Sequence, residues 1–442
     1  ASNAVHLKET RDELRAEPGL SRVTAAGYLD GNQTADLSAF QMVCCSFESL
    51  LKVEGEAFGL VTCDEISALA LKVGGGTMPH FECIAVLREL LAQPGTRVLA
   101  LDAAAHFKMS DTEPYTVVEH FFHLVAPRRN VLSVALDRAN MPPHLLRRLR
   151  VYYGSDKAQT QQFWKQFEGA IAAYQADNSQ LILFAVGTKS IGRKEVCSRL
   201  QDKGVPFRFY HGDSAVSTRF RDLADPGKWW AQLGAIVHTT VVGRGVDLPG
   251  PPTLKVSRVF VTMDRLGCDY GELFQAMVRA REVQNPTIEV LLVRTMAPEQ
   301  RAQLVREGKR KPIVRPTFEQ SLKRETARRG YALRAAERQA RAAGEDRSST
   351  PASEALLLLM AHSDLNRKMQ ETDPVYTFKR YADYYKMPIE TMPPSVAQAA
   401  ADGALQLDED DAFDVNASPE EKCAIVVRTI RERGELGFFN DQ

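Results

Sequence analysis

The chain has 442 residues and a mass of 49.2 kDa, which is too long for one compact core and favours about three domains. Its hydrophobic content of 44% and charged content of 25% are those of an ordinary globular protein, and they exclude wholly disordered, collagen-like and disulfide-scaffold classes. Because 56 basic residues balance 56 acidic ones, the net charge neither indicates nor excludes a nucleic-acid partner.

The seven cysteines form no Cys-x-x-Cys pair and have no zinc-type spacing to a histidine, so we expect them to be reduced and mostly buried. Apolar runs stay shorter than a membrane span requires, and the sequence does not open with a signal-peptide pattern. We therefore expect no membrane partner and a reducing intracellular location, either nuclear or cytoplasmic.

Helical and strand patterns alternate over residues 3–137, which favours a parallel sheet covered on both faces. We expect helices at 8–17 and 81–92, and strands at 40–45, 59–63, 97–101 and 130–136.

A second alternation follows, with its join to the first near residues 152–159. We expect helices at 160–175, 193–203 and 270–280, and strands at 181–186, 207–210, 235–239, 258–262 and 288–293.

From residue 298 onward, strand patterns give way to arginine-rich helical segments such as 318–343. Residues 346–353 are typical of a flexible linker, and residues 407–414 of an acidic loop. The predicted fold is α/β, with two tandem parallel-sheet domains at 1–152 and 153–297 and a mainly helical region at 298–442.

The strand at 59–63 leads into two adjacent carboxylates, Asp64 and Glu65. At the carboxyl end of a strand in an open sheet, Asp64 could hold Mg²⁺, and Glu65 could orient or deprotonate an attacking water. The same pair also suits the start of a helix, where acidic side chains complement the helix dipole. Taken alone, the pair leaves both interpretations open.

The helix at 270–280 carries Gln275 and Arg279 four residues apart on one face, followed by Arg281. The two arginines could reach a γ-phosphate across a domain cleft, as an arginine finger does. A solvated basic helix face would explain the same residues.

Polar loops follow two further strands. Gly245 and Asp247 lie in a Gly-Arg-Gly-x-Asp loop whose amides could face a phosphate or ribose. A Tyr-His-Gly-Asp turn with His211 and Asp213 closes the strand at 207–210. Ordinary loops between a strand and a helix have the same kinds of residues, so a purely structural role is also possible for both segments.

In sequence order, these four signals resemble motifs II, IV–V and VI of superfamily-two helicases. Within that superfamily, residues 45–53 and 98–103 resemble the replication-origin-binding helicases of the herpesvirus type. The resemblance covers about residues 5–297.

The resemblance implies two RecA-like domains that clamp ATP with Mg²⁺, and an ATP-dependent DNA helicase or translocase of the origin-binding type. Its partners would be single-stranded or duplex DNA and replication proteins. It assigns Mg²⁺ binding to Asp64, water activation to Glu65, and sensing of the γ-phosphate to Gln275, Arg279 and Arg281. It places Gly245 and Asp247 near the nucleotide, and it implies that Asp102 and Ala103 couple hydrolysis to movement of the strand. The residues that it implies grip the nucleic-acid backbone are Ser49, Lys189 and Thr239.

Two features depart from the family pattern. Val278 stands where motif VI usually has a glycine, and a Gly-x-x-x-x-Gly-Lys-Ser/Thr phosphate loop occurs nowhere in the sequence. The first domain therefore looks incomplete, either because the natural product is longer or because the chain is a degenerate relative. We expect this chain alone to be inactive in hydrolysis. A non-hydrolysing nucleic-acid-binding scaffold and an RNA helicase remain as alternatives.

Residues 301–345 carry 13 basic and 5 acidic side chains, which could neutralise phosphates without reading sequence. Arg324, Arg328 and Arg329 are the candidates for DNA contact, although i,i+4 pairs with glutamate would equally suit a solvated helix. An aromatic stripe at 376–385 and the Trp229–Trp230 pair are assigned to packing.

Overall fold

The computed structural model describes residues 25–27, 42–45, 47–75, 81–101, 104–126, 147–224, 226–242, 255–278, 283–342 and 352–391. The chain divides into two compact units, Ala1–Pro393 and Pro394–Gln442, and every described residue belongs to the first. The predicted segments 8–17, 130–136 and 407–414, and most of 346–353, lie outside the described residues.

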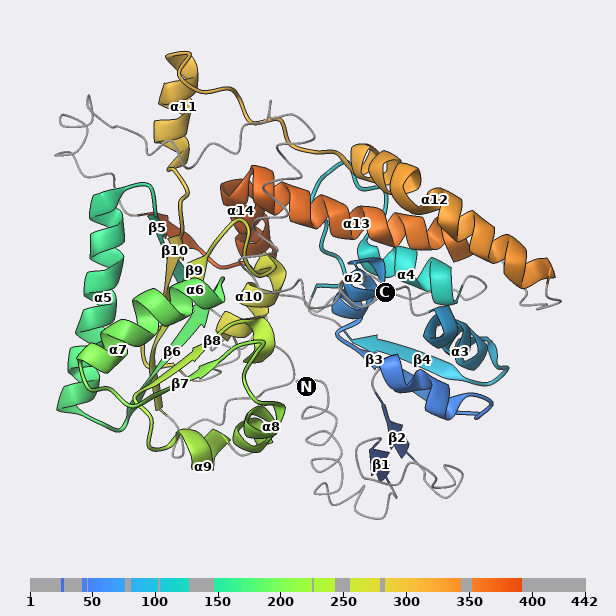
Figure 1. Cartoon of the computed structure of the whole chain (residues 1–442), viewed down its shortest axis with the longest axis horizontal. Helices are drawn as coiled ribbons and strands as arrows, with labels where there is room; N and C mark the ends of the chain where they lie inside the picture. The colour runs from blue at the N-terminus through green and yellow to red at the C-terminus, as the bar shows by residue number, and fades with distance from the viewer. Residues whose placement is uncertain are drawn as a thin grey trace, which may run out of the picture. The chain divides into compact units, whose positions relative to one another are not determined.

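The centre of the fold is a parallel seven-stranded sheet with strand order β11-β5-β10-β9-β6-β8-β7 (Figure 1). Its strands β6 and β8 are buried along almost their whole length, which explains their continuous apolar sequences. The strands are β5 (Arg148–Tyr153), β6 (Gln180–Val186), β7 (Phe207–Tyr210), β8 (Ala235–His238), β9 (Lys255–Met263), β10 (Thr287–Leu292) and β11 (Ile389–Thr391).

Helices cover both faces of this sheet. Alternate residues along β6 separate into two cores, with Ile182 and Phe184 in one and Leu181 and Leu183 in the other. The first core holds residues of α5 (Lys157–Ala176) and of the continuous helical stretch formed by α6 (Lys189–Ile191), η5 (Gly192–Cys197) and α7 (Ser198–Asp202). The second core holds residues of α8 (Val216–Ala224), α9 (Pro226–Trp230), α10 (Tyr270–Val278) and the C-terminal helices. The predicted α/β class with a parallel sheet is thereby confirmed.

The described part of the first half has its own core around the parallel pair β3 (Leu60–Asp64) and β4 (Arg97–Leu101). Helix α4 (Val117–Val125) begins with a capping box, in which Thr116 and Glu119 satisfy each other's backbone amides. The remaining elements here are the parallel pair β1 (Ala25–Gly27) and β2 (Met42–Cys44), together with η2 (Phe47–Val53), α2 (Ile66–Gly75) and α3 (Phe81–Ala92).

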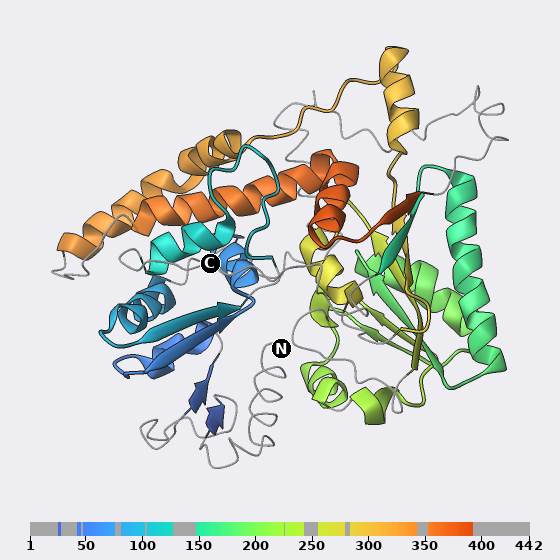
Figure 2. The ribbon, with the colours of Figure 1, turned by 180° about the vertical axis from the view of Figure 1, so that it is seen from behind.

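The C-terminal region contains α11 (Pro298–Arg306), α12 (Phe318–Ala342), α13 (Ala352–Thr372) and α14 (Pro374–Tyr384). Helices α12 and α13 pack side by side, as the view from behind also shows (Figure 2). The described part of this region, up to residue 391, is mainly helical, as predicted, but β11 corrects the expectation that strands end before residue 298. β11 joins the sheet because it pairs with β5 from Leu149 to Val151.

The predicted domain boundary after residue 152 falls inside β5. Pairing with β10 holds the whole of Arg148–Tyr153 in the seven-stranded sheet, so this strand groups with the second half of the chain. The strand was not predicted, because Arg148 and Arg150 interrupt its apolar residues.

Free thiols are found at Cys45, Cys63, Cys83, Cys197 and Cys268, of which Cys83 and Cys197 are buried and the others half-buried. Burial raises the pKa of Cys63 and Cys197 to about 11, so both are protonated at neutral pH. Within the described residues, no helix is long and apolar enough to cross a membrane.

Candidate nucleic-acid and nucleotide site

Two residues predicted to contact nucleic acid, together with His211 of the predicted polar turn, follow neighbouring strands of the large sheet. Lys189 comes after β6, His211 after β7 and Thr239 after β8, and these strands are adjacent in the order β6-β8-β7. Ala185 and Tyr210 both lie opposite His238, so the three strands end at nearly the same level. Parallel strands place ligand sites in the crevice beyond their carboxyl ends. The fold therefore gathers these residues at one edge.

Lys189 and Asp213 form an ion pair at this edge, and both side chains reach solvent. The hydrogen bond from Lys189 holds the pKa of Asp213 below its ordinary value. Burial and the nearby charge of Lys189 lower the pKa of His211, whose Nδ1 accepts the Asp213 amide at 3.2 Å. The edge therefore carries one exposed ammonium group beside an ionised carboxylate.

Close backbone contacts stiffen the same edge. The Thr239 amide donates to the Tyr210 carbonyl at 3.0 Å, and its side chain is almost buried. A Cβ atom at Gly267 would lie 2.4 Å from the Gly187 carbonyl oxygen, so the loops after β6 and β9 touch through their backbones. The Cys268 amide, which donates to Gly187 at 2.8 Å, completes this contact.

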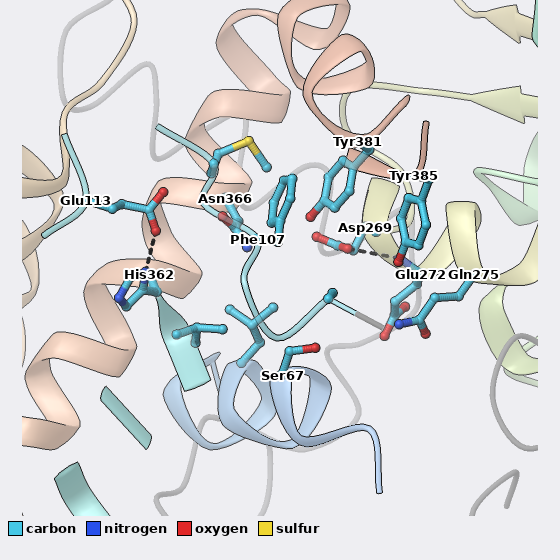
Figure 3. A pocket seen from close by; sticks show the side chains of 15 residues that line it. Ser67, Phe107, Glu113, Asp269, Glu272, Gln275, His362, Asn366, Tyr381 and Tyr385 are labelled. Atoms are coloured by element: carbon cyan, nitrogen blue, oxygen red, sulfur yellow. Dashed lines mark hydrogen bonds and ion pairs between the residues drawn. The ribbon is translucent and has the colours of Figure 1, made fainter. Parts of the chain in front are cut away.

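A pocket lies where α2, α10, α13 and α14 meet (Figure 3). Ser67 on α2 and Gln275 on α10 both line it, together with His362 on α13 and Tyr381 on α14. Glu65, which directly precedes α2, has a left-handed backbone with φ of 49°. The structure thus brings the helix that follows Asp64 and Glu65 to the same pocket as Gln275.

A buried chain of titratable groups borders this pocket. His362 Nδ1 lies 2.6 Å from a Glu113 carboxylate oxygen and donates to it, and His362 Nε2 lies 2.7 Å from His120 Nδ1. Phe318 packs against both imidazole rings. Burial, followed by the nearby charge of His362, lowers the pKa of His120 to about 4. Sequence reasoning missed this chain, because 242 residues separate the two histidines.

The three arginines predicted to contact DNA all have carboxylate partners. Arg324 pairs with the buried Asp364 at 2.6 Å, while Arg328 and Arg329 pair with Glu325 at 2.9 and 3.5 Å. Burial alone would raise the pKa of Asp364, but hydrogen bonds from Arg324 hold it below its ordinary value. Part of the positive charge of α12 is therefore neutralised within the protein.

Several predicted residues fall outside this geometry. Ser49 is buried in η2. The backbone of Asp64 ends β3, but its side chain is not among those described. Among the described residues, no cluster of three or more His, Cys, Asp or Glu side chains could hold a metal ion. The residues outside the described part of the chain are Asp102, Ala103, Gly245, Asp247, Arg279 and Arg281.

No protein-family model and no curated protein matches this sequence. The chain is similar to a solved structure of S. cerevisiae Dbp5 bound to RNA and ADP BeF3, with 14% identity, coverage of 69% of this chain and 72% of that one, and a TM-score of 0.45. It is also similar to the DEAD-box helicase Mss116 bound to ssRNA and UDP-BeF, with 15% identity, coverage of 79% and 73%, and a TM-score of 0.43.

A third similar structure is the helicase MrfA bound to DNA, with 14% identity, coverage of 69% of this chain and 44% of that one, and a TM-score of 0.41. Likeness at this level assigns neither an activity nor a ligand to the chain. The origin-binding family remains a prediction from sequence.

Proposed function

We propose that this chain is part of an ATP-dependent helicase or translocase of the origin-binding type, and that it grips single-stranded DNA along the carboxyl edge of its large sheet. The observation that carries this proposal is the convergence of Lys189, His211 and Thr239 at the ends of three adjacent strands. A lysine beside backbone amides at such an edge suits phosphate binding.

Lys189 would contact the nucleic-acid backbone in competition with Asp213. A phosphate that approaches the ammonium group must displace or share the carboxylate, which repels it. We therefore expect the two residues to affect DNA affinity in opposite directions. Ser49 and the arginines of α12 are further proposed contacts.

The proposed nucleotide site combines Asp64 and Glu65 with Gln275, Arg279 and Arg281, and it includes Gly245 and Asp247, with Asp102 and Ala103 coupling hydrolysis to movement. Support comes from the pocket that Ser67 and Gln275 share. The carboxylate of Asp64 offers the oxygen ligands that Mg²⁺ prefers, and Glu65 would orient or deprotonate the attacking water. When bound together with ATP, Mg²⁺ would neutralise negative charge on the phosphates. Gln275 would contact the γ-phosphate of the nucleotide.

The test of nucleic-acid binding is fluorescence anisotropy of the full chain with a labelled oligothymidylate over a salt series. Lys189→Ala should lower affinity and flatten the plot of log K against log salt by about 0.7, the value for one contact on a single strand. Asp213→Asn should raise affinity. Lys165→Ala, which removes an exposed lysine on α5, is the matched control.

An unchanged slope in Lys189→Ala would contradict the proposed edge. The same series with oligouridylate separates DNA from RNA as the substrate, because backbone grip alone does not read the 2′-hydroxyl.

A second candidate is a non-hydrolysing scaffold, which the absence of a lysine-bearing phosphate loop from this sequence favours. Losing electrostatic stabilisation of that kind typically raises the barrier by several kcal/mol. A phosphate-release assay with single-stranded DNA tests the scaffold. Turnover of about 1 s⁻¹ or more, the low end for phosphoryl-transfer enzymes, would exclude it, whereas both candidates are compatible with background turnover of this chain alone.

A further inference from the structure

Helix α13 makes direct contact with α2, the helix that follows Asp64 and Glu65. Leu356, Leu359 and Met360 of α13 belong to the same buried core as Ile66 and Ala70 of α2. A Cβ atom at Gly74, near the end of α2, would lie 2.4 Å from the Leu359 carbonyl oxygen. Since that oxygen belongs to the backbone, α2 and α13 approach each other as closely as a glycine allows.

The other end of α13 holds the loop that leads into α10. The buried Gln370 side chain accepts the Tyr270 amide at 3.0 Å, which is the first amide of α10. Its Nε2 group donates to the carbonyls of Asp264, Arg265 and Cys268 at 3.4, 3.3 and 3.1 Å. One side chain therefore satisfies backbone groups throughout the turn before α10.

Two further contacts fix α10 in place. The Tyr381 hydroxyl of α14 lies 2.8 Å from the position that a Cβ atom would take at Gly271. At the opposite end of the helix, Arg147 donates to the Met277 carbonyl at 3.0 Å. Helix α10 is thus held at both ends, and Gln275 lies between them.

We propose that α13 is a brace that couples α2 to α10, and that Gln370 is the positioning residue through which it sets the place of Gln275. This inference rests on the proposed function, because α2 and α10 are the helices assigned to the two sides of the nucleotide site. A continuous helix of 21 residues spans roughly 30 Å at 1.5 Å per residue. It is stiff enough to carry a displacement from one end to the other.

The experiment is hydrogen–deuterium exchange of the full chain without nucleotide or nucleic acid. Gly74→Ala forces α13 away from α2, and we expect it to speed exchange of amides in residues 266–273 by about fivefold, the ratio for losing one ordinary hydrogen bond. Gln370→Met keeps the side-chain volume but removes the hydrogen bonds, and it should speed exchange both there and in α2. The double variant should add little to either change.

The matched controls are Gly169→Ala, a helical glycine with open space at its Cβ, and Lys368→Ala, which changes α13 without touching the loop. Both variants should leave the exchange rates in α2 and in residues 266–273 unchanged. If Gly74→Ala changes exchange only in α2 and Gln370→Met changes it only in residues 266–273, α13 packs against both helices but does not couple them. If Gln370→Met leaves α10 unchanged, Gln370 only fills space.

The outcome is separate from the proposed function. Loss of the exchange coupling with an intact effect of Lys189→Ala on DNA binding would overturn the brace alone. Intact coupling with no effect of Lys189→Ala would instead count against the proposed function.

Discussion

At the scale of single residues, two helical glycines have opposite environments. A Cβ atom at Gly169 in α5 would meet no atom within 4 Å, whereas one at Gly74 in α2 would collide with the backbone of Leu359. We expect Gly169→Ala to raise the free energy of unfolding by about 0.5–1 kcal/mol through helix propensity. Gly74→Ala should lower it by about 1–3 kcal/mol through overpacking. Urea denaturation of both variants checks the signs, and equal shifts would contradict the α2–α13 contact.

Two buried histidines predict how stability depends on pH. Burial lowers the pKa of His120 and of His238 to about 4, below the ordinary 6.5. The unfolded chain therefore binds more protons between these values, so the free energy of unfolding falls as pH drops from about 6.5 towards about 4. It should be insensitive to these groups above about pH 7.5.

The measurement is the urea midpoint at pH 7.5, 6 and 5. His120→Gln and His238→Gln should each weaken the acid sensitivity. A midpoint that stays constant from pH 7.5 to 5 in the parent chain would refute the assignment.

At the scale of elements, the basic face of α12 also stabilises its packing on α13. Arg324 neutralises Asp364, whose side chain is only 3% exposed. Arg324→Ala would leave this carboxylate with Arg367, at 3.0 Å, and the Ser321 hydroxyl as partners. We expect the free energy of unfolding to fall by about 1–2 kcal/mol, less than for a fully buried pair because Arg324 is partly exposed. Lys323→Ala, at an exposed position, should change it by under about 0.5 kcal/mol.

The DNA-binding role of α12 remains a prediction from sequence. Replacing Arg324, Arg328 and Arg329 together should flatten the salt slope of single-strand binding by roughly 1–2 units if all three meet phosphates. Because each has a carboxylate partner, phosphate must compete with Asp364 and Glu325. Anisotropy over a salt series measures the slope, and equal slopes in variant and parent would assign the arginines to packing.

At the scale of the whole molecule, the helices of residues 352–384 and the strand β11 are part of the α/β fold and not an appendage. Phe378 and Tyr381 of α14 belong to the core of the large sheet, and β11 extends that sheet beyond β5. We expect a fragment of residues 1–297 to lose cooperative unfolding, because it exposes this core and leaves the Gln370 contacts unmade. Thermal unfolding followed by circular dichroism checks this, and a cooperative transition matching the full chain would contradict it.

The sequence by itself determined the elements that local patterns encode. α3 and β4 have the predicted bounds, and β6, β7 and β10 lie within one residue of the predicted strands. The continuous apolar sequence of β6 is a reliable signal, because a strand buried on both faces favours apolar side chains along its length. The sequence also placed Lys189, His211 and Thr239 after strands, which is enough to expect them near one edge of a parallel sheet.

Only the tertiary structure decided which distant residues meet. β5 was missed because its arginines look incompatible with burial, yet Arg150 pairs with the buried Glu289 of β10 at 3.2 Å. Glu113, His362 and Gln370 are polar residues with nothing unusual in their local sequence. Glu113 pairs with His362, and Gln370 pairs with the turn before α10. Their partners lie about a hundred or more residues away, and a buried polar group is stable only where the fold supplies its hydrogen bonds. No local pattern encodes that pairing, because the energy that selects it exists only once the chain has packed.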